Sequence, residues 1–294
     1  MGDSKAAHGS VVIIGAGTQG RRLAYMWSSR GGTVHLIDHN KQQLEAALGY
    51  VLQLRAKPTD ESGNWGDIIL SGPTQLAYVL RDAWLAVECV PEKLSLKQEV
   101  ISQLDNLAPD HAIIASNSSS YGIGEIIQGI QLRNDQRLLS AHCYWPPETS
   151  AIEIMGHEGT DPSCVAVLLD QCREHGFSPF HVKQNSIGYI YNRIWAAIKR
   201  ETLLVLSEGV CGPQEIDAIF KDVLQTPKGP CEQMDVVGLD VVLDIENHYA
   251  ESRSGLPSEP RELLKEMIRN GLLGVKGQRG FYDYRDAPEQ VPRL

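Results

Sequence analysis

The stretch VVIIGAGTQGRRLAYMW, from Val11 to Trp27, decides the fold of this chain. It begins with four β-branched apolar residues, continues through three glycines, and ends in a segment whose apolar residues have helical spacing. An apolar run bounded by a glycine-rich turn predicts a buried strand, and the segment after it predicts a helix. This strand–turn–helix unit indicates a sheet wound with helices.

The remainder of the chain extends this pattern and then changes. Apolar β-rich runs alternate with helical patterns as far as about Val182, for example TVHLID at 33–38, AWLAVECV at 83–90 and HAIIAS at 111–116. After Asn185, apolar residues recur at helical spacing to the end of the chain. We therefore predict the α/β class: a Rossmann-type, doubly wound, mostly parallel sheet in residues 1–184, followed by an all-α C-terminal domain in residues 185–294.

Charge and composition limit the partners and the location. The formal net charge of −10 at pH 7 argues against nucleic acid and anionic membranes as main partners. No apolar run approaches the ~18 residues that a membrane span needs, and the polar start MGDSKAAHGS lacks the apolar core of a signal peptide. We expect a cytoplasmic protein, with a peroxisomal location as the alternative suggested by the final Pro292-Arg293-Leu294. The six cysteines show no metal-ligand spacing, so we expect reduced thiols and no metal site.

The glycines have the spacing of a dinucleotide-binding loop. Gly15 permits the tight turn, Gly17 lets backbone amides approach a pyrophosphate, and Gly20 lets the helix pack on the strand. Thr18 and Gln19 lie between the last two glycines, at the start of the helix, where the positive end of the helix dipole favours phosphate. An ordinary loop is the alternative interpretation.

Asp38 supports the nucleotide interpretation. It ends the run TVHLID, 23 positions after Gly15, close to the spacing expected for a carboxylate that accepts from a ribose 2′-hydroxyl. A carboxylate there repels a 2′-phosphate, so we predict NAD rather than NADP, although His39 and Lys41 leave NADP open. The alternative is that Asp38 only caps a helix that begins near Asn40.

Two further clusters point to chemistry. Asn117 to Ser120 follow the apolar run HAIIAS, where ligands gather at the carboxyl ends of parallel strands; a serine-rich turn is the alternative. In LLSAHCYWPPETSAIEIM, at 138–155, His142 follows a predicted strand and Glu153 lies in the next apolar run, after two prolines. A carboxylate on one ring nitrogen would orient a histidine acting as general base, whereas a structural histidine is the alternative. Asn192, early in the long helical segment, could reach a substrate oxygen or be a surface amide.

Together these motifs resemble the 3-hydroxyacyl-CoA dehydrogenase family. GAGTQG with the later aspartate, VECVPEKLSLK, ASNSSS, SAHCYWPP with IEIM, IGYIYNR, GPCEQMDVVGLD and KGQRGFYDY occur in family order between Val11 and Tyr284. The resemblance implies an NAD-dependent dehydrogenase that oxidises an L-3-hydroxyacyl group to the 3-oxo form, runs the reverse reaction, and forms a homodimer through its helical domain. VECVPEKLSLK and the double proline also resemble the L-gulonate 3-dehydrogenase (lambda-crystallin) branch, whose substrates carry no coenzyme A.

The resemblance also assigns site residues. It implies that His142 and Glu153 are the catalytic pair, that Ser119 and Asn192 hold the substrate oxygen, and that Glu92, Lys97 and Asn117 line the cofactor site. This chain departs from the family at CYWPP, where Trp145 stands in place of an asparagine, and between Asp38 and AWLAVECV, where the segment that helps to grip coenzyme A is short and contains Pro58 and the acidic TDESGNWGD.

These departures leave three functions open. The first is an NAD-dependent dehydrogenase of 3-hydroxyacyl-CoA esters, and the second is a dehydrogenase or ketoreductase of a 3-hydroxy acid or bulky metabolite without coenzyme A. Tyr144, Trp145, Tyr189, Tyr191 and Trp195 could form an aromatic wall for such a metabolite. The third is an NAD-binding structural or regulatory protein without turnover. A 3-hydroxyisobutyrate type of dehydrogenase is a further alternative, which the position of Lys199 outside its helix pattern disfavours.

Overall fold

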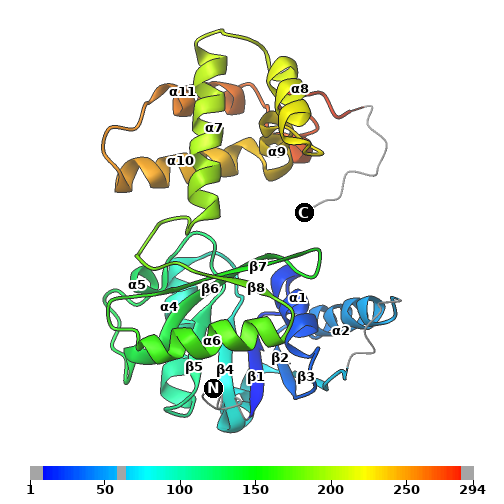
Figure 1. Ribbon diagram of the computed structural model, residues 1–294, viewed down its shortest axis with the longest axis vertical. Helices are drawn as coiled ribbons and strands as arrows, with labels where there is room; N and C mark the ends of the chain where they lie inside the picture. The colour runs from blue at the N-terminus through cyan, green and yellow to red at the C-terminus, as the bar shows by residue number, and fades with distance from the viewer. Residues whose placement is uncertain (1–8, 58–63, 286–294) are drawn as a thin grey trace. The chain divides into compact units, whose positions relative to one another are not determined.

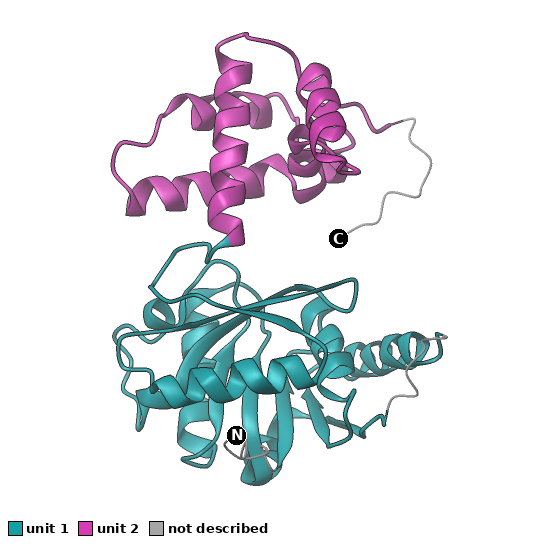
Figure 2. Ribbon diagram, in the orientation of Figure 1, with its two compact units in different colours: residues 1–190 teal, residues 191–294 magenta. Residues whose placement is uncertain are grey.

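The computed structural model describes residues 9–57 and 64–285 of the chain (Figure 1). It consists of two compact units, Met1–Ile190 and Tyr191–Leu294 (Figure 2). The division comes six residues after the boundary predicted at Gln184. The polar start, Pro58 with much of TDESGNWGD, and the C-terminal Pro-Arg-Leu lie outside the described residues.

The first unit is built on one mixed sheet whose strands lie in the order β3-β2-β1-β4-β5-β6-β7-β8. Neighbouring strands from β3 to β6 are parallel, β6 and β7 are antiparallel, and β7 and β8 are parallel. The strands are β1 Ser10–Ile14, β2 Val34–Ile37, β3 Ile68–Ser71, β4 Ala83–Glu88, β5 Ile113–Ser116, β6 Leu138–Trp145, β7 Thr149–Gly156 and β8 Ser178–His181. The predicted doubly wound, mostly parallel sheet is confirmed.

Helices cover both faces of this sheet because its strands are apolar on both sides. On β1, Val11 and Ile13 pack in a core with α1, α2 and α6, whereas Val12 packs in a second core with α3, α4 and α5. The helices are α1 Thr18–Trp27, α2 Lys41–Arg55, α3 Leu76–Val79, α4 Leu94–Leu107, α5 Ile123–Ile126 and α6 Pro162–Glu174, with the 3₁₀ turns η1 Pro73–Gln75, η2 Leu80–Asp82 and η3 Asp135–Arg137. The alternation along β1 therefore sets the layers of the unit (Figure 1).

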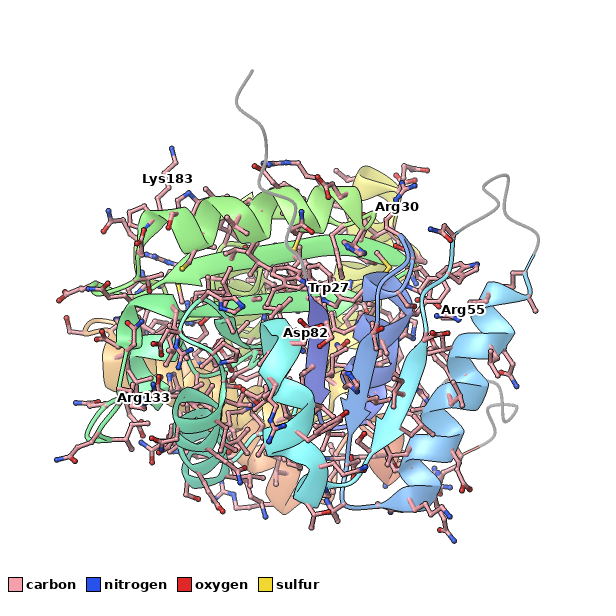
Figure 3. All side chains as sticks on the ribbon, turned by 90° about the horizontal axis from the view of Figure 1, so that it is seen from below. Trp27, Arg30, Arg55, Asp82, Arg133 and Lys183 are labelled. Atoms are coloured by element: carbon pink, nitrogen blue, oxygen red, sulfur yellow. The ribbon has the colours of Figure 1, made fainter. Side chains whose placement is uncertain are left out.

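Aromatic packing fixes α1 against the sheet. The Trp27 ring is buried in the interior, whereas Lys183 lies at the rim (Figure 3). The centroid of the Trp27 ring lies 5.7 Å from that of Trp84 on β4, 4.9 Å from that of His175 and 5.4 Å from that of Phe177. Aromatic rings at these separations attract one another in addition to burying apolar surface. They hold the far end of the helix whose first turn follows the glycine loop.

The named elements of the second unit are all helices, which confirms the predicted all-α domain. They are α7 Tyr191–Ser207, α8 Pro213–Leu224, α9 Pro230–Val237, α10 Leu239–Ser252, α11 Glu259–Arg269 and the turn η4 Val275–Gly277. The buried carboxylate of Asp235 accepts the backbone N–H groups of Phe281 and Tyr282 and the hydroxyl of Tyr284, so it fastens the segment after η4 to α9. Among residues 9–57 and 64–285, no helix combines the length and apolar composition needed to cross a membrane.

Candidate active site

The glycine loop joins β1 to α1 and leaves no room for a larger residue at Gly15 or Gly20. Gly15 has φ +103°, and a Cβ there would lie 2.6 Å from the Cys89 carbonyl oxygen. A Cβ on Gly20 would lie 1.8 Å from the Gly15 carbonyl oxygen, whereas one on Gly17 would meet only a side-chain nitrogen at 4.0 Å. Gly17 is also the N-cap of α1 and provides no side-chain cap. The open space and the uncapped backbone N–H groups fit a pyrophosphate.

Asp38 follows β2 beside this loop. Its Oδ2 accepts the N–H of Ala16 at 2.9 Å, and its Oδ1 accepts the N–H of Asn40 at 2.8 Å. The side chain that caps α2 is Asn40, which accepts from Gln43, so the alternative that Asp38 caps this helix is wrong. A carboxylate held at the switch point of the strand order, where β1 lies between β2 and β4, fits the ribose of NAD.

A cluster of charges, in which Lys97 and Glu88 are buried and Glu92 is exposed, lies at the carboxyl ends of β4 and β5. The Lys97 ammonium lies 3.1 Å from Glu88 and 3.1 Å from Glu92. Lys97 is 1% exposed and Glu88 is 0% exposed. Burial lowers the pKa of Lys97, but the two carboxylates outweigh it and the net shift is upward. Burial raises the pKa of Glu92, but Lys97 and hydrogen bonds from Ser118 and Ser120 lower it more, so the net shift is downward.

Two of the residues predicted to bind cofactor contact the backbone of β6. The side-chain Oδ1 of Asn117 accepts the backbone N–H of Cys143 at 3.0 Å. The Gln19 amide, on the first turn of α1, donates to the Tyr144 carbonyl oxygen at 2.7 Å. Thr18 is the first residue of the same helix. The nucleotide loop and the strand that carries His142 are therefore joined directly.

His142 lies inside β6, so the prediction that it follows the end of a strand is wrong. The last residue of β6 that pairs with β5 is Ser140, opposite Ser116. Beyond it β6 pairs only with β7, where His142 lies opposite Glu153. The histidine is thus two residues past the carboxyl edge of the parallel ladder, because the antiparallel partner extends the strand. Directly opposed residues of antiparallel strands share one face of the sheet.

The His142 ring is enclosed by aromatic side chains. It stacks on Tyr189 with centroids 5.0 Å apart and an interplanar angle of 15°, and it meets Tyr144 edge-on at 4.7 Å. The residue is 6% exposed, and its Nδ1 has no hydrogen-bond partner in the described part of the chain. Burial lowers the pKa of His142 from 6.5 to about 4, although Glu92 opposes the shift. The imidazole is therefore neutral at pH 7.

Glu153 is buried, 2% exposed, beside this ring. Its Oε2 accepts from the Tyr144 hydroxyl, and its Oε1 accepts the N–H of Ile190 at 2.8 Å. The sequence predicts that this carboxylate bonds a ring nitrogen of His142. The structure places the two side chains next to each other, but the carboxylate bonds Tyr144 and Ile190 and leaves Nδ1 without a partner.

Comparison with known proteins identifies the family. A sequence model of the 3-hydroxyacyl-CoA dehydrogenase NAD-binding domain matches residues 10–185, and one of the C-terminal domain of 3-hydroxyacyl-CoA dehydrogenase matches residues 188–284. The chain belongs to the 3-hydroxyacyl-CoA dehydrogenase family. It is thus an NAD-dependent oxidoreductase that acts on CH–OH groups, and the expected cofactor is confirmed.

Three similar proteins illustrate the range of this family. Mouse mitochondrial hydroxyacyl-coenzyme A dehydrogenase is 30% identical over 291 residues, which is 94% of this chain and 91% of the mouse protein. The crystal structure of (S)-3-hydroxybutyryl-CoA dehydrogenase from Ralstonia eutropha has a TM-score of 0.81 at 27% identity, covering 95% of this chain and 100% of that one. A diketoreductase described as a catalyst of dicarbonyl compounds has a TM-score of 0.74 at 28% identity, covering 94% and 99%.

In this 3-hydroxyacyl-CoA dehydrogenase family member, two predicted site residues, Ser119 and Asn192, lie on other segments than His142. Ser119 is exposed and follows the buried Ser118, whose carbonyl oxygen accepts the Tyr189 hydroxyl at 2.7 Å. Asn192 is the second residue of α7, half-buried, in the second unit. The roles assigned to Ser119 and Asn192 stay predictions. The described residues contain no cluster of His, Cys, Asp or Glu side chains that could hold a metal.

Sequence reasoning missed three features of this site. Glu88 binds Lys97 from within β4, and its only sequence signal is one acidic residue in the apolar run AWLAVECV. The Tyr144 hydroxyl on Glu153 had no signal, because it depends on the pairing of β6 with β7. Tyr189 was expected in an aromatic wall for substrate; it is instead buried, with its hydroxyl bonded to Ser118.

Proposed function

We propose that this protein interconverts an L-3-hydroxyacyl group and its 3-oxo form with NAD, with His142 as the group that moves the hydroxyl proton. The supporting observation is a buried, neutral imidazole opposite a buried carboxylate, just past the carboxyl edge of a sheet whose β1–α1 loop fits a dinucleotide. Ligands of doubly wound sheets bind outside this edge.

The loop of Gly15, Gly17 and Gly20 would hold the pyrophosphate, and Asp38 the adenosine ribose. Bound NAD supplies the acceptor for the C3 hydride. The Nε2 atom of His142 would take the hydroxyl proton during oxidation and return it during reduction, since a neutral imidazole is the proton acceptor. Ser119 and Asn192 would bind the substrate oxygen, and the charge of Glu153 would favour the imidazolium formed.

His142→Gln tests this proposal. General acid–base assistance contributes about 10² to 10⁴ in rate, so kcat should fall by that factor while NADH binding, followed by fluorescence, stays within twofold. His181→Gln is the matched control, because His181 is exposed on β8, and it should keep wild-type kcat. A His142→Gln protein with near wild-type kcat on a true substrate would exclude His142 as the base.

The substrate is either a coenzyme A ester or a 3-oxo acid without coenzyme A. The second candidate, a substrate without coenzyme A, is supported by the region between β2 and β3. Among the described residues of this region, α2 is the one helix that could help to grip coenzyme A. The Arg55 guanidinium at its end lies 4.8 Å from the Trp65 ring centroid and donates to the Gly66 carbonyl oxygen, so it is engaged within the fold. The double proline shared with the L-gulonate 3-dehydrogenase branch and the similarity to a diketoreductase also favour it.

An assay of NADH oxidation with acetoacetyl-CoA beside free 3-oxo acids and diketones separates these candidates. Turnover of only the thioester supports the coenzyme A substrate, and turnover of only the free compounds supports the second. NADH binding without turnover of either class would support the structural or regulatory protein. The joint presence of His142, Glu153, Ser119 and Asn192 speaks against that last outcome.

We further propose a homodimer formed through the helical unit. Several apolar side chains of α8 are exposed, namely Ile219, Val223 and Leu224, and exposed apolar patches indicate association surfaces. Light scattering of the purified protein measures this directly. A mass of one chain, near 32.4 kDa, at micromolar concentration would contradict the dimer.

A further inference from the structure

We infer that Tyr144 is a positioning residue, whose hydroxyl binds the Glu153 carboxylate in place of the His142 imidazole and thereby weakens the affinity of the imidazole for a proton. The inference rests on the proposed function only in taking His142 as the proton-transferring group. It adds a residue that the motifs of the family did not assign.

Strand geometry brings the three side chains together. Ala141 and Cys143 of β6 pack in the core with α1, α2 and α6. His142 and Tyr144 therefore face the opposite side of the sheet, because side chains alternate along a strand. Glu153 lies opposite His142 in the register of β6 and β7, so its side chain shares that face.

The carboxylate is anchored by two donors from different elements. The Tyr144 hydroxyl donates to Oε2 and the Ile190 N–H donates to Oε1. A carboxylate oxygen that accepts such a bond is less available to a further donor. The His142 Nδ1, buried on the same face, has no hydrogen-bond partner in the residues described. Tyr144 and Nδ1–H are thus competing donors for one carboxylate, and Tyr144 holds it.

Other charged and titratable groups near His142 do not produce this arrangement. Glu92, from the loop after β4, attracts a proton to the ring, and its carboxylate lies 3.1 Å from the Lys97 ammonium. Tyr189, from the segment before α7, stacks on the ring and bonds the Ser118 carbonyl. Removal of the Tyr144 hydroxyl takes one donor from Oε2 of Glu153, the atom for which Nδ1–H competes.

The test is an NMR titration of the ¹⁵N-labelled protein without substrate or cofactor, with the His142 signals identified by their loss in His142→Gln. Tyr144→Phe should strengthen the proton affinity of His142 at least tenfold, which is about one pH unit or more. Tyr189→Phe is the matched control, because it removes a hydroxyl from an equally close ring that bonds Ser118 and not Glu153. It should shift the titration by less than threefold.

Two outcomes would overturn the inference. One is a Tyr144→Phe titration that matches the wild-type protein, or a shift equal to that of Tyr189→Phe. The other needs no variant: a wild-type His142 that titrates at or above its ordinary pKa of about 6.5. The double variant Glu153→Gln/Tyr144→Phe tests whether the hydroxyl acts through the carboxylate. In it the proton affinity of His142 should not rise. Because the titration uses no substrate, its failure is distinct from failure of the proposed reaction.

Discussion

The buried neutral His142 makes the stability of the protein depend on pH in a defined window. Its pKa is about 4 in the folded protein, against about 6.5 in the unfolded chain. About one pH unit or more above 6.5 both states are neutral at this position, so His142 contributes no pH dependence there. As the pH falls below 6.5 the unfolded chain binds a proton that the folded protein does not, and the free energy of unfolding decreases.

The magnitude follows from the two pKa values. At pH 5 the unfolded chain is about 1.5 pH units below its pKa, and at about 1.4 kcal/mol per unit the loss is about 2 kcal/mol relative to pH 7.5. The assay is urea unfolding of the wild-type protein and His142→Gln at both pH values, followed by circular dichroism. The wild-type protein should lose about 2 kcal/mol more than the variant between the two pH values.

The comparison with His142→Gln isolates this one group. His35 and His175 are half-buried, with partial burial the main cause of their lowered pKa, and they titrate in both proteins. An equal loss of stability in the wild-type protein and His142→Gln would mean that the imidazole is protonated in the folded state. The argument that burial lowers the pKa of His142 would then be wrong.

Three other substitutions have defined outcomes. Gly20→Ala should abolish NADH binding measured by fluorescence, because its Cβ would lie 1.8 Å from a carbonyl oxygen of the loop, whereas Gly49→Ala on α2 meets no atom within 4 Å and should bind normally. Lys97→Met should lower the free energy of unfolding by about 3–5 kcal/mol, since it leaves Glu88 buried and unpaired, and adding Glu88→Gln should recover part of that loss in urea titrations. Asp235→Ala removes the acceptor of two backbone N–H groups and should cost at least about 2 kcal/mol in thermal unfolding; wild-type stability would show that water replaces the carboxylate.

The fold could be predicted from the sequence because its signals are local. The apolar run before Gly15, the glycine spacing and the aspartate 23 positions later each depend on a few neighbouring residues. The change to helical spacing after Asn185 marked the helical unit for the same reason. These patterns gave the sheet, the all-α unit and the cofactor.

The details of the site depend on pairings that no local pattern encodes. His142 falls inside β6 because residues after Ser140 pair with β7 alone, and the end of β5 cannot be read from the β6 sequence. The register of β6 and β7 also shifts between Cys143 and Trp145. This irregularity lies beside Tyr144, so neither the bond to Glu153 nor the missing partner of Nδ1 followed from counting residues.

The Gln19 side chain has a consequence for binding. It extends from the first turn of α1, next to the nucleotide loop, to the backbone of the strand that carries His142. We expect occupancy of the loop and protonation of the imidazole to be linked through this contact. The factor by which bound dinucleotide changes the proton affinity of His142 equals the factor by which the proton changes the affinity for dinucleotide. Uptake or release of a fraction of a proton should thus accompany dinucleotide binding, before any substrate is present.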